Sequence, residues 1–163
     1  MTDKAWCFCD RESYKDRIFR ESGDFYCLFD DAPVSPGHAL IAPKKHIVSI
    51  LELDQETWNK LYVEIVETIK IIEKTDLKKL YQEMLDGKMY DNIEWFLKKS
   101  CNHPRINTKP DGYNHGVNDG RAAGRTTDHL HWHVIPRYDG DVNDPKGGVR
   151  FVIPEMGNYK IAR

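Results

Sequence analysis

The stretch His129-Leu130-His131-Trp132-His133-Val134-Ile135 alternates histidine with large apolar residues. Because side chains of a β-strand point to opposite faces in turn, this alternation predicts a strand, which we extend over residues 128–138. On that strand the three imidazoles share one face. Leu130, Trp132 and Val134 share the other face, which we expect to be core. A solvated surface is a poor explanation for three histidines in one row, so the row is the first candidate site.

Two kinds of chemistry use a row of histidines: metal binding, and nucleophilic or acid–base catalysis. On a straight strand the outer two Cα atoms lie about 13 Å apart, at roughly 3.3 Å per residue. Zinc needs its nitrogen ligands at about 2 Å, so three such imidazoles do not converge easily on one ion. A central nucleophile with a flanking proton donor fits the row without strain, because an imidazole can attack through one nitrogen while the other is oriented.

The loop before the row has the groups that bind phosphate. Residues 120–127, Gly-Arg-Ala-Ala-Gly-Arg-Thr-Thr, supply backbone N–H groups, two hydroxyls and two guanidiniums. By itself the loop matches neither a Walker A loop nor a dinucleotide-binding fingerprint, and a plain turn is the alternative. Directly ahead of three histidines, it indicates a phosphate-containing substrate.

The rest of the chain predicts separate groups of strands and helices. Residues 24–30, 38–42 and 113–118 predict strands, with a proline-rich turn at 33–37. Asp54 is a candidate N-cap for a helix ending near Thr75, with one apolar stripe formed by Trp58, Leu61, Tyr62, Ile65, Ile69 and Ile72. Residues 77–85 and 90–99 predict two amphipathic helices, and the tail is mostly loop with an apolar piece at 149–153. This segregation predicts an α+β fold with a largely antiparallel sheet.

Composition limits the class of protein. The chain has 163 residues and a formal net charge of −2, which argues against nucleic acid as the main partner. The apolar runs are too short to span a membrane, and the first residues lack a secretory signal, so we expect a cytoplasmic protein. The four cysteines are then expected to be free thiols rather than disulfides. A metal role for Cys7 or Cys9 is the alternative.

Taken together, these motifs resemble the histidine-triad (HIT) superfamily, whose motif is His-φ-His-φ-His-φ-φ with φ apolar. Phe8-Cys9, residues 30–38, residues 41–46 and residues 118–124 follow the family's order and approximate spacing. Residues 129–138 and 147–150 resemble bacterial members that hydrolyse dinucleoside polyphosphates. The resemblance implies one HIT domain over residues 1–163, with a sheet of about five strands, a long helix, and a helical insertion at about 76–107.

The resemblance also implies roles for particular residues. His131 would attack the α-phosphorus of a purine nucleotide and form a covalent nucleotidyl-histidine, which water would release. His133 would assist the leaving group, His129 would hold the row in place, and His38 would lie beside it. Substrate contacts would come from Asp30 on the ribose, from Asn118, Gly124, Arg125 and Thr126 on the phosphates, and from Phe19, Phe29 and Leu40 around the base.

Several alternatives stay open. Many bacterial relatives bind structural zinc through Cys-x-x-Cys and two histidines, whereas this chain has Cys7-Phe8-Cys9. Zinc on Cys9, His46 and His129 is therefore a hypothesis. Catalysis itself should require no metal, although Mg²⁺ would accompany a polyphosphate. Arg125 replaces the family's usual Gln and either pairs with the substrate or points away.

For the reaction, the leading prediction is dinucleoside polyphosphate hydrolysis. The alternatives are nucleoside phosphoramidate hydrolysis, nucleotidyl transfer and a non-catalytic nucleotide-binding module. Compact members of the family pair through the helix and the sheet edge, so we also expect a homodimer.

Overall fold

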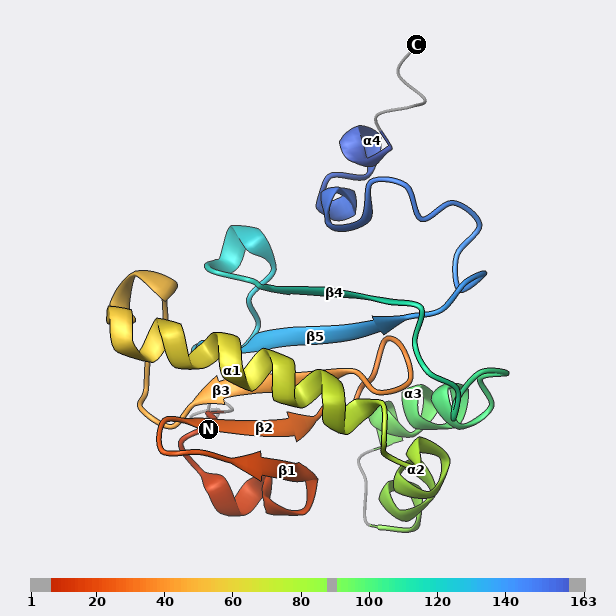
Figure 1. The fold of residues 1–163 in the computed structure, drawn as a ribbon, viewed down its shortest axis with the longest axis horizontal. Helices are drawn as coiled ribbons and strands as arrows, with labels where there is room; N and C mark the ends of the chain where they lie inside the picture. The colour runs from red at the N-terminus through yellow and green to blue at the C-terminus, as the bar shows by residue number, and fades with distance from the viewer. Residues whose placement is uncertain (1–6, 88–90, 159–163) are drawn as a thin grey trace.

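A five-stranded sheet forms the centre of the computed structural model, which describes residues 7–87 and 91–158 (Figure 1). The strand order is β1-β2-β3-β5-β4, and all neighbouring strands are antiparallel. The strands are β1 Ile18–Glu21, β2 Phe25–Phe29, β3 Ala39–Pro43, β4 Gly112–Val117 and β5 Trp132–Arg137. The helices beside this antiparallel sheet confirm the predicted α+β class. The sequence pattern missed β1, which is short and has no fully buried residue.

The strand predicted for residues 128–138 is shorter than expected. It begins at Trp132, so His129 and His131 lie in the segment that leads into β5. The physical reason is the end of its neighbour β3 at Pro43, a residue without an N–H group to continue the ladder. The chain bonds elsewhere instead: the Leu130 amide donates to the Ile47 carbonyl, and the His129 side chain reaches the Pro43 carbonyl.

Helix α1, Gln55–Ile72, covers one face of the sheet, as Figure 1 shows. The predicted N-cap is confirmed, because the Asp54 carboxylate accepts a hydrogen bond from the Thr57 amide at 2.7 Å. The helix ends at Ile72, three residues before the predicted end. The apolar stripe is narrower than predicted: Leu61 and Ile72 are buried in the core, whereas Trp58 and Tyr62 are 42% and 71% exposed.

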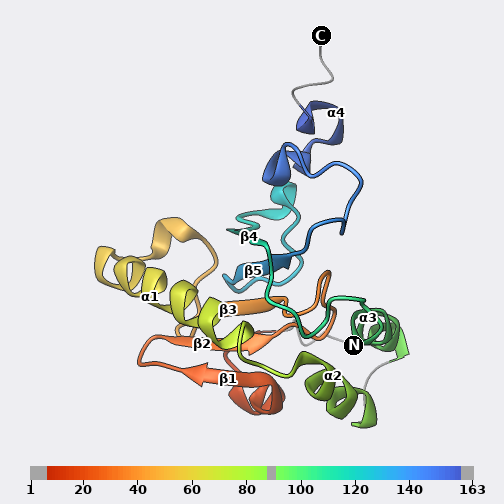
Figure 2. The ribbon, with the colours of Figure 1, turned by 45° about the vertical axis from the view of Figure 1, so that its right-hand side comes forward.

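The two amphipathic helices predicted in the insertion are present as α2 Leu77–Asp86 and α3 Asp91–Cys101, which lie side by side (Figure 2). Their core residues Tyr81 and Leu97 are fully buried. The Tyr81 hydroxyl accepts a hydrogen bond from the Gly37 amide at 2.7 Å. Gly37 has a φ of +87°, and a Cβ there would lie 2.8 Å from the Ile72 side chain. The insertion therefore supports the turn that leads to His38.

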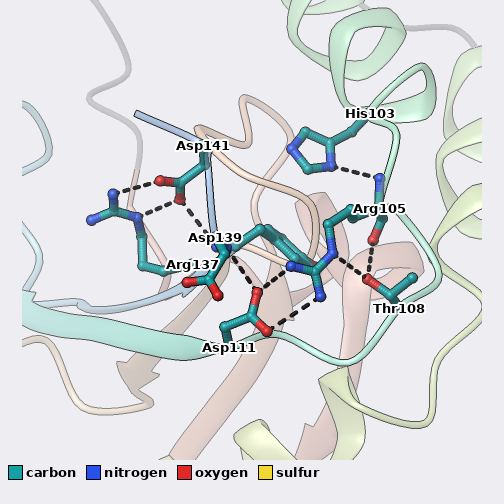
Figure 3. Close-up of polar contacts among 8 residues, drawn as sticks. His103, Arg105, Thr108, Asp111, Arg137, Asp139 and Asp141 are labelled. Atoms are coloured by element: carbon teal, nitrogen blue, oxygen red, sulfur yellow. Dashed lines mark hydrogen bonds and ion pairs between the residues drawn. The ribbon is translucent and has the colours of Figure 1, made fainter. Parts of the chain in front are cut away.

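Two arginine–carboxylate pairs fix the loops at the far end of β5 (Figure 3). Arg137 bonds to Asp141 through two nitrogens, at 2.6 and 2.8 Å. Arg105, which follows α3, pairs with Asp111, and the same carboxylate accepts from the Asp139 amide at 2.8 Å. These contacts attach the insertion and the start of the tail to the sheet.

Short turns complete the described chain. The apolar piece predicted at 149–153 falls largely within a 3₁₀ turn, Gly148–Val152, whose apolar side chains are exposed, and the four-residue helix α4, Pro154–Gly157, follows it. Further 3₁₀ turns are Arg11–Ser13, Lys15–Arg17, Ile50–Glu52 and Arg121–Ala123. Among the residues with described positions, no helix has the length and apolarity needed to cross a bilayer.

The bond between Tyr81 and Gly37 yields a stability prediction. In Tyr81→Phe the buried Gly37 amide loses its acceptor, so we expect the free energy of unfolding to fall by about 1–3 kcal/mol in urea titrations. The control Tyr62→Phe removes an exposed hydroxyl and should change it by less than about 0.5 kcal/mol. Equal values for the two variants would contradict a supporting role of the insertion.

Candidate active site

The middle histidine is held in one tautomer by the backbone. His131 Nδ1 lies 2.9 Å from the carbonyl oxygen of His129. A carbonyl only accepts hydrogen bonds, so Nδ1 carries the proton and Nε2 keeps its lone pair. The ring also packs against Phe8, with centroids 5.3 Å apart. This arrangement presents an oriented nucleophilic nitrogen.

The third histidine belongs to a chain of polar groups. His133 Nδ1 lies 3.0 Å from His38 Nε2, and His38 Nδ1 lies 3.3 Å from an Asp30 carboxylate oxygen. His38 Nδ1 also lies 3.5 Å from the Val34 amide. The second nitrogen of His133, Nε2, is buried and has no hydrogen-bond partner among residues 7–87 and 91–158. Among the linked groups Asp30, His38 and His133, this nitrogen is therefore the atom that can bind a substrate or water.

Burial keeps these imidazoles neutral. Loss of hydration, with a smaller contribution from the nearby His131, lowers the pKa of His38 to about 4. Loss of hydration is also the main cause that lowers the pKa of His133 to about 4, with smaller effects from His38 and His131 and an opposing effect from Asp30. At neutral pH the free protein therefore holds both rings uncharged.

The expected phosphate loop lies beside Asn118. Gly120 and Gly124 have φ values of +99° and +95°, which suit glycine in a tight turn. A Cβ on Gly124 would lie 4.0 Å from the Asn118 side chain, so these two expected phosphate contacts are neighbours. Thr126 is exposed beside them. Val117 pairs with Trp132 in the register of β4 and β5, so Asn118 lies next to the segment that carries His131.

Arg125 points neither at an open phosphate site nor into solvent. Its side chain is 14% exposed and donates to the Val48 carbonyl at 2.9 Å. It also pairs with Asp128 at 3.2 Å. Asp119 lies beside the Arg125 guanidinium, and its carboxylate accepts a hydrogen bond from the Ser49 hydroxyl at 2.9 Å. Arg125 thus joins the loop to the segment after β3.

The three residues expected around the base are divided between the two faces of the sheet. Phe29 is 3% exposed within the core cluster under α1, and Phe19 packs against that cluster with its ring 4.6 Å from Phe29. Leu40 lies on the opposite face and pairs in register with His133. The structure therefore brings only Leu40 to the histidine side, and alternation along β2 was the signal that could have separated Phe29 from it.

A second cluster gathers two cysteines and two histidines. The sulfurs of Cys7 and Cys9 lie 3.3–3.6 Å from Nδ1 of His46 and of His129. Tetrahedral zinc with sulfur and nitrogen ligands places such atoms roughly 3.5 Å apart. The zinc hypothesis from the sequence named Cys9, His46 and His129, and it considered a metal role for Cys7 only as an alternative to Cys9, whereas the structure brings all four together. The Cys9 amide donates to the Cys7 sulfur at 3.3 Å, and this tight turn lets Cys-x-Cys present both thiols.

The donor chemistry of this cluster suits a divalent cation. His129 Nε2 lies 2.7 Å from the Pro43 carbonyl, which requires a proton on Nε2 and leaves the Nδ1 lone pair facing the sulfurs. A hydrogen bond to Cys7 is the main cause that raises the pKa of the Cys9 thiol to about 11, and burial is a smaller cause. The protein alone thus disfavours thiolate here, and a cation between the sulfurs would reverse this preference. The residues present fit zinc.

The depressed histidine pKa values predict how stability depends on pH. Between pH 6.5 and about 4 the unfolded chain binds protons at His38 and His133 that the folded protein does not bind, so stability falls as pH falls through this range. Urea unfolding between about pH 7 and pH 5 should show this decline, and His133→Gln should show a shallower one. Equal slopes would contradict a buried neutral His133.

The comparisons with known proteins identify the family of this chain. The HIT domain model matches residues 11–140. An uncharacterized HIT-like protein of Methanocaldococcus jannaschii is 25% identical over 77% of this chain and 71% of its own length. The bis(5'-adenosyl)-triphosphatase of Dictyostelium discoideum is 26% identical over 73% of this chain and 60% of its own. A zinc-bound histidine triad family protein of Mycobacterium smegmatis has a similar fold, with a TM-score of 0.56 and 23% identity over 96% of both chains. The chain belongs to the HIT domain family.

Proposed function

We propose that this protein hydrolyses dinucleoside polyphosphates by attack of His131 on the α-phosphorus of a purine nucleotide. The observation that carries the proposal is the tautomer of His131, whose Nδ1 proton is bound by the His129 carbonyl so that Nε2 is free to attack. The HIT family supports nucleotide hydrolysis or binding in general. The similarity to bis(5'-adenosyl)-triphosphatases favours a dinucleoside polyphosphate as the substrate.

The reaction divides into two displacements. In the first, His131 Nε2 forms a bond to the α-phosphorus as the bond to the leaving group breaks. In the second, water attacks the same phosphorus, releases the nucleoside monophosphate and restores His131. Asn118 and the amides near Gly124, which are neighbours, would bind the phosphate oxygens as charge shifts among them. His133 would meet the leaving group and then the water through Nε2.

Nucleoside phosphoramidate hydrolysis is the second candidate, because it uses the same phosphorus and the same nucleophile. The proposal gives Arg125 a positioning role in either reaction, since its guanidinium holds the loop through Val48 and Asp128. Transfer to an acceptor other than water is less favoured, because the best-known transferases have Gln where this chain has His133.

The activity is tested with His131→Ala and two substrates, diadenosine tetraphosphate and adenosine phosphoramidate. We expect the wild-type protein to release AMP and the variant to lose at least about 10³-fold in rate, because no other group can form the covalent intermediate. His115→Ala is the matched control, since this exposed imidazole bonds only to the Trp132 indole in the described structure. The ratio of the two wild-type rates identifies the preferred leaving group.

Two outcomes would contradict the proposal. Nucleotide binding without turnover by the wild-type protein would favour a binding module. Full activity of His131→Ala would exclude covalent catalysis by this residue.

We further propose that Cys7, Cys9, His46 and His129 bind structural zinc. The support is the fit of their donor atoms and the zinc-bound Mycobacterium smegmatis protein of similar fold. Zinc there would fix the segment that carries the His129 carbonyl and so the orientation of His131. It would take no part in the displacement itself.

The zinc proposal predicts metal content and stability. Purified protein should contain about one zinc per chain, and Cys7→Ser and Cys9→Ser should each lose most of it, with a lower melting temperature. Cys101→Ser is the matched control, because this thiol lies in α3 and contacts the Lys78 carbonyl. Equal zinc content in the three variants, measured by plasma mass spectrometry, would exclude this cluster as the site.

A homodimer and a cytoplasmic location remain predictions. Two features support pairing of chains. β4 lies at the edge of the sheet with one neighbour, and α1 exposes Trp58 and Tyr62.

A further inference from the structure

We propose that a pocket beyond His133 binds the second nucleoside of the dinucleoside polyphosphate, the one that departs with the leaving group. This inference rests on the proposed function and assigns a site to the half of the substrate that does not react with His131. The pocket has a volume of about 550 Å³, which is within the range of ligand sites. It is lined by the turn at 33–36, the end of α3, the strands β4 and β5, and the tail that follows β5.

The pocket continues the face of the sheet that carries the histidines. His133 and Ile135 are two positions apart on β5, so their side chains point to the same side, and Ile135 lines the pocket. At 3.3 Å per residue their Cα atoms lie roughly 7 Å apart. Under the proposed function the leaving group meets His133. The rest of the leaving molecule therefore enters the pocket by following β5 one further step.

The neighbouring strand β4 leaves space on the way to the pocket. Asn118, Gly116 and Asn114 occupy alternate positions, and Asn114 lines the pocket. The register places Gly116 opposite His133 and Asn114 opposite Ile135. A Cβ on Gly116 would meet no atom of the described chain within 4 Å. A polyphosphate that begins at Asn118 can therefore pass over Gly116 without meeting a side chain there.

The apolar part of the lining suits a base. It comes from the turn, from β5 and from the tail, and consists mainly of Pro33, Pro36, Ile135 and Phe151. The Phe151 ring is 42% exposed, so a base has access to it for stacking. Stacking on an aromatic side chain is a strong contact for any base, because every base has a π-face.

Two polar side chains of the lining have hydrogen-bonding capacity left for a ligand. Ser35 Oγ is buried and has no hydrogen-bond partner among residues 7–87 and 91–158. Asn114 Oδ1 accepts from Arg137 at 2.6 Å, which leaves the Nδ2 protons to donate. A ribose hydroxyl or a ring nitrogen of the base would satisfy both groups.

His103 adds a donor of fixed direction. Its Nδ1 accepts from the Arg105 amide at 3.2 Å, and burial is the main cause that lowers the pKa of the ring, so at neutral pH the proton is on Nε2. The ring also packs against Tyr138, with centroids 5.0 Å apart. Figure 3 shows Nε2 turned away from Arg105 and toward the side of Asp141, which lines the same pocket.

The charges of the lining leave one cation for the phosphates. The carboxylates Asp141 and Asp144 are paired with Arg137 and Lys146. Lys99 is exposed and has no ion pair among the residues that the structure describes. A long flexible side chain of this kind can place its ammonium on a phosphate oxygen. The pocket therefore suits a nucleoside joined to an anionic chain.

The test compares diadenosine tetraphosphate with adenosine tetraphosphate, which has the same reacting phosphorus but no second nucleoside. In Phe151→Ala we expect kcat/KM for the dinucleotide to fall about 10-fold, because the leaving nucleoside loses its stacking partner. For adenosine tetraphosphate kcat/KM should change by less than about twofold, since nothing occupies the pocket. Val152→Ala is the matched control, because this neighbouring side chain is 78% exposed and does not line the pocket.

The two substrates also separate this inference from the proposed function. Equal losses with both substrates in Phe151→Ala, or no loss with either, would overturn the pocket as a nucleoside site and leave the hydrolysis in place. Absence of turnover of both substrates by the wild-type protein would reject the proposed function instead.

Photolabelling of the wild-type protein decides the case in which Phe151→Ala does not fold or turnover is absent. The probe is diadenosine tetraphosphate with methylene groups next to both α-phosphorus atoms and 8-azidoadenine as both bases. On irradiation it should label residues 99–103 or 148–151, whereas 8-azido-AMP should not. Labelling confined to other parts of the chain would overturn the proposal, and so would equal labelling of these residues by 8-azido-AMP.

Discussion

The pairing of β3 with β5 is the constraint on which the rest of the site depends. It places Leu40 opposite His133, and its last pair is Ile41 with Trp132, two residues before Pro43, which has no amide to continue the ladder. Since His38 directly precedes β3, the same pairing brings His38 within hydrogen-bond distance of His133. The segment before Trp132 is no longer paired with β3, and the side chains of His129 and His131 bind to separate groups. One register thus determines both the contact between His38 and His133 and the point at which the histidine row leaves the sheet.

The three histidines look equivalent in the sequence, but their surroundings give them different chemistry. His129 is fully buried between the Pro43 carbonyl and the thiols of Cys7 and Cys9. His131 is bound through Nδ1 to the carbonyl of His129. His133 is bound to the side chain of His38. A backbone acceptor, a thiol pair and an imidazole therefore decide which nitrogen of each ring is available.

Periodic patterns predicted the parts of this structure that depend on local preferences. The cap at Asp54, the strands on either side of the turn at 33–37 and both helices of the insertion follow from spacing and turn residues. The start of β5 depends on where its neighbour ends, and the burial of Phe29 depends on which face α1 covers. The local pattern does not show where a neighbouring strand ends, and alternation along β2 separates two faces without showing which of them α1 covers. The predicted zinc set left Cys7 out for a related reason, since its place beside Cys9 in the cluster depends on a turn at Cys9.

The insertion and the turn at residues 33–37 are mechanically connected, which limits how freely either can change. Tyr81 binds the amide of Gly37, the residue directly before His38, and Gly37 has no room for a side chain beside Ile72. A shift of α2 would therefore move the ring that lies between Asp30 and His133. Contacts of 3.0 and 3.3 Å tolerate little displacement before they are lost. The helices added beside the sheet thus support the position of His38 between Asp30 and His133.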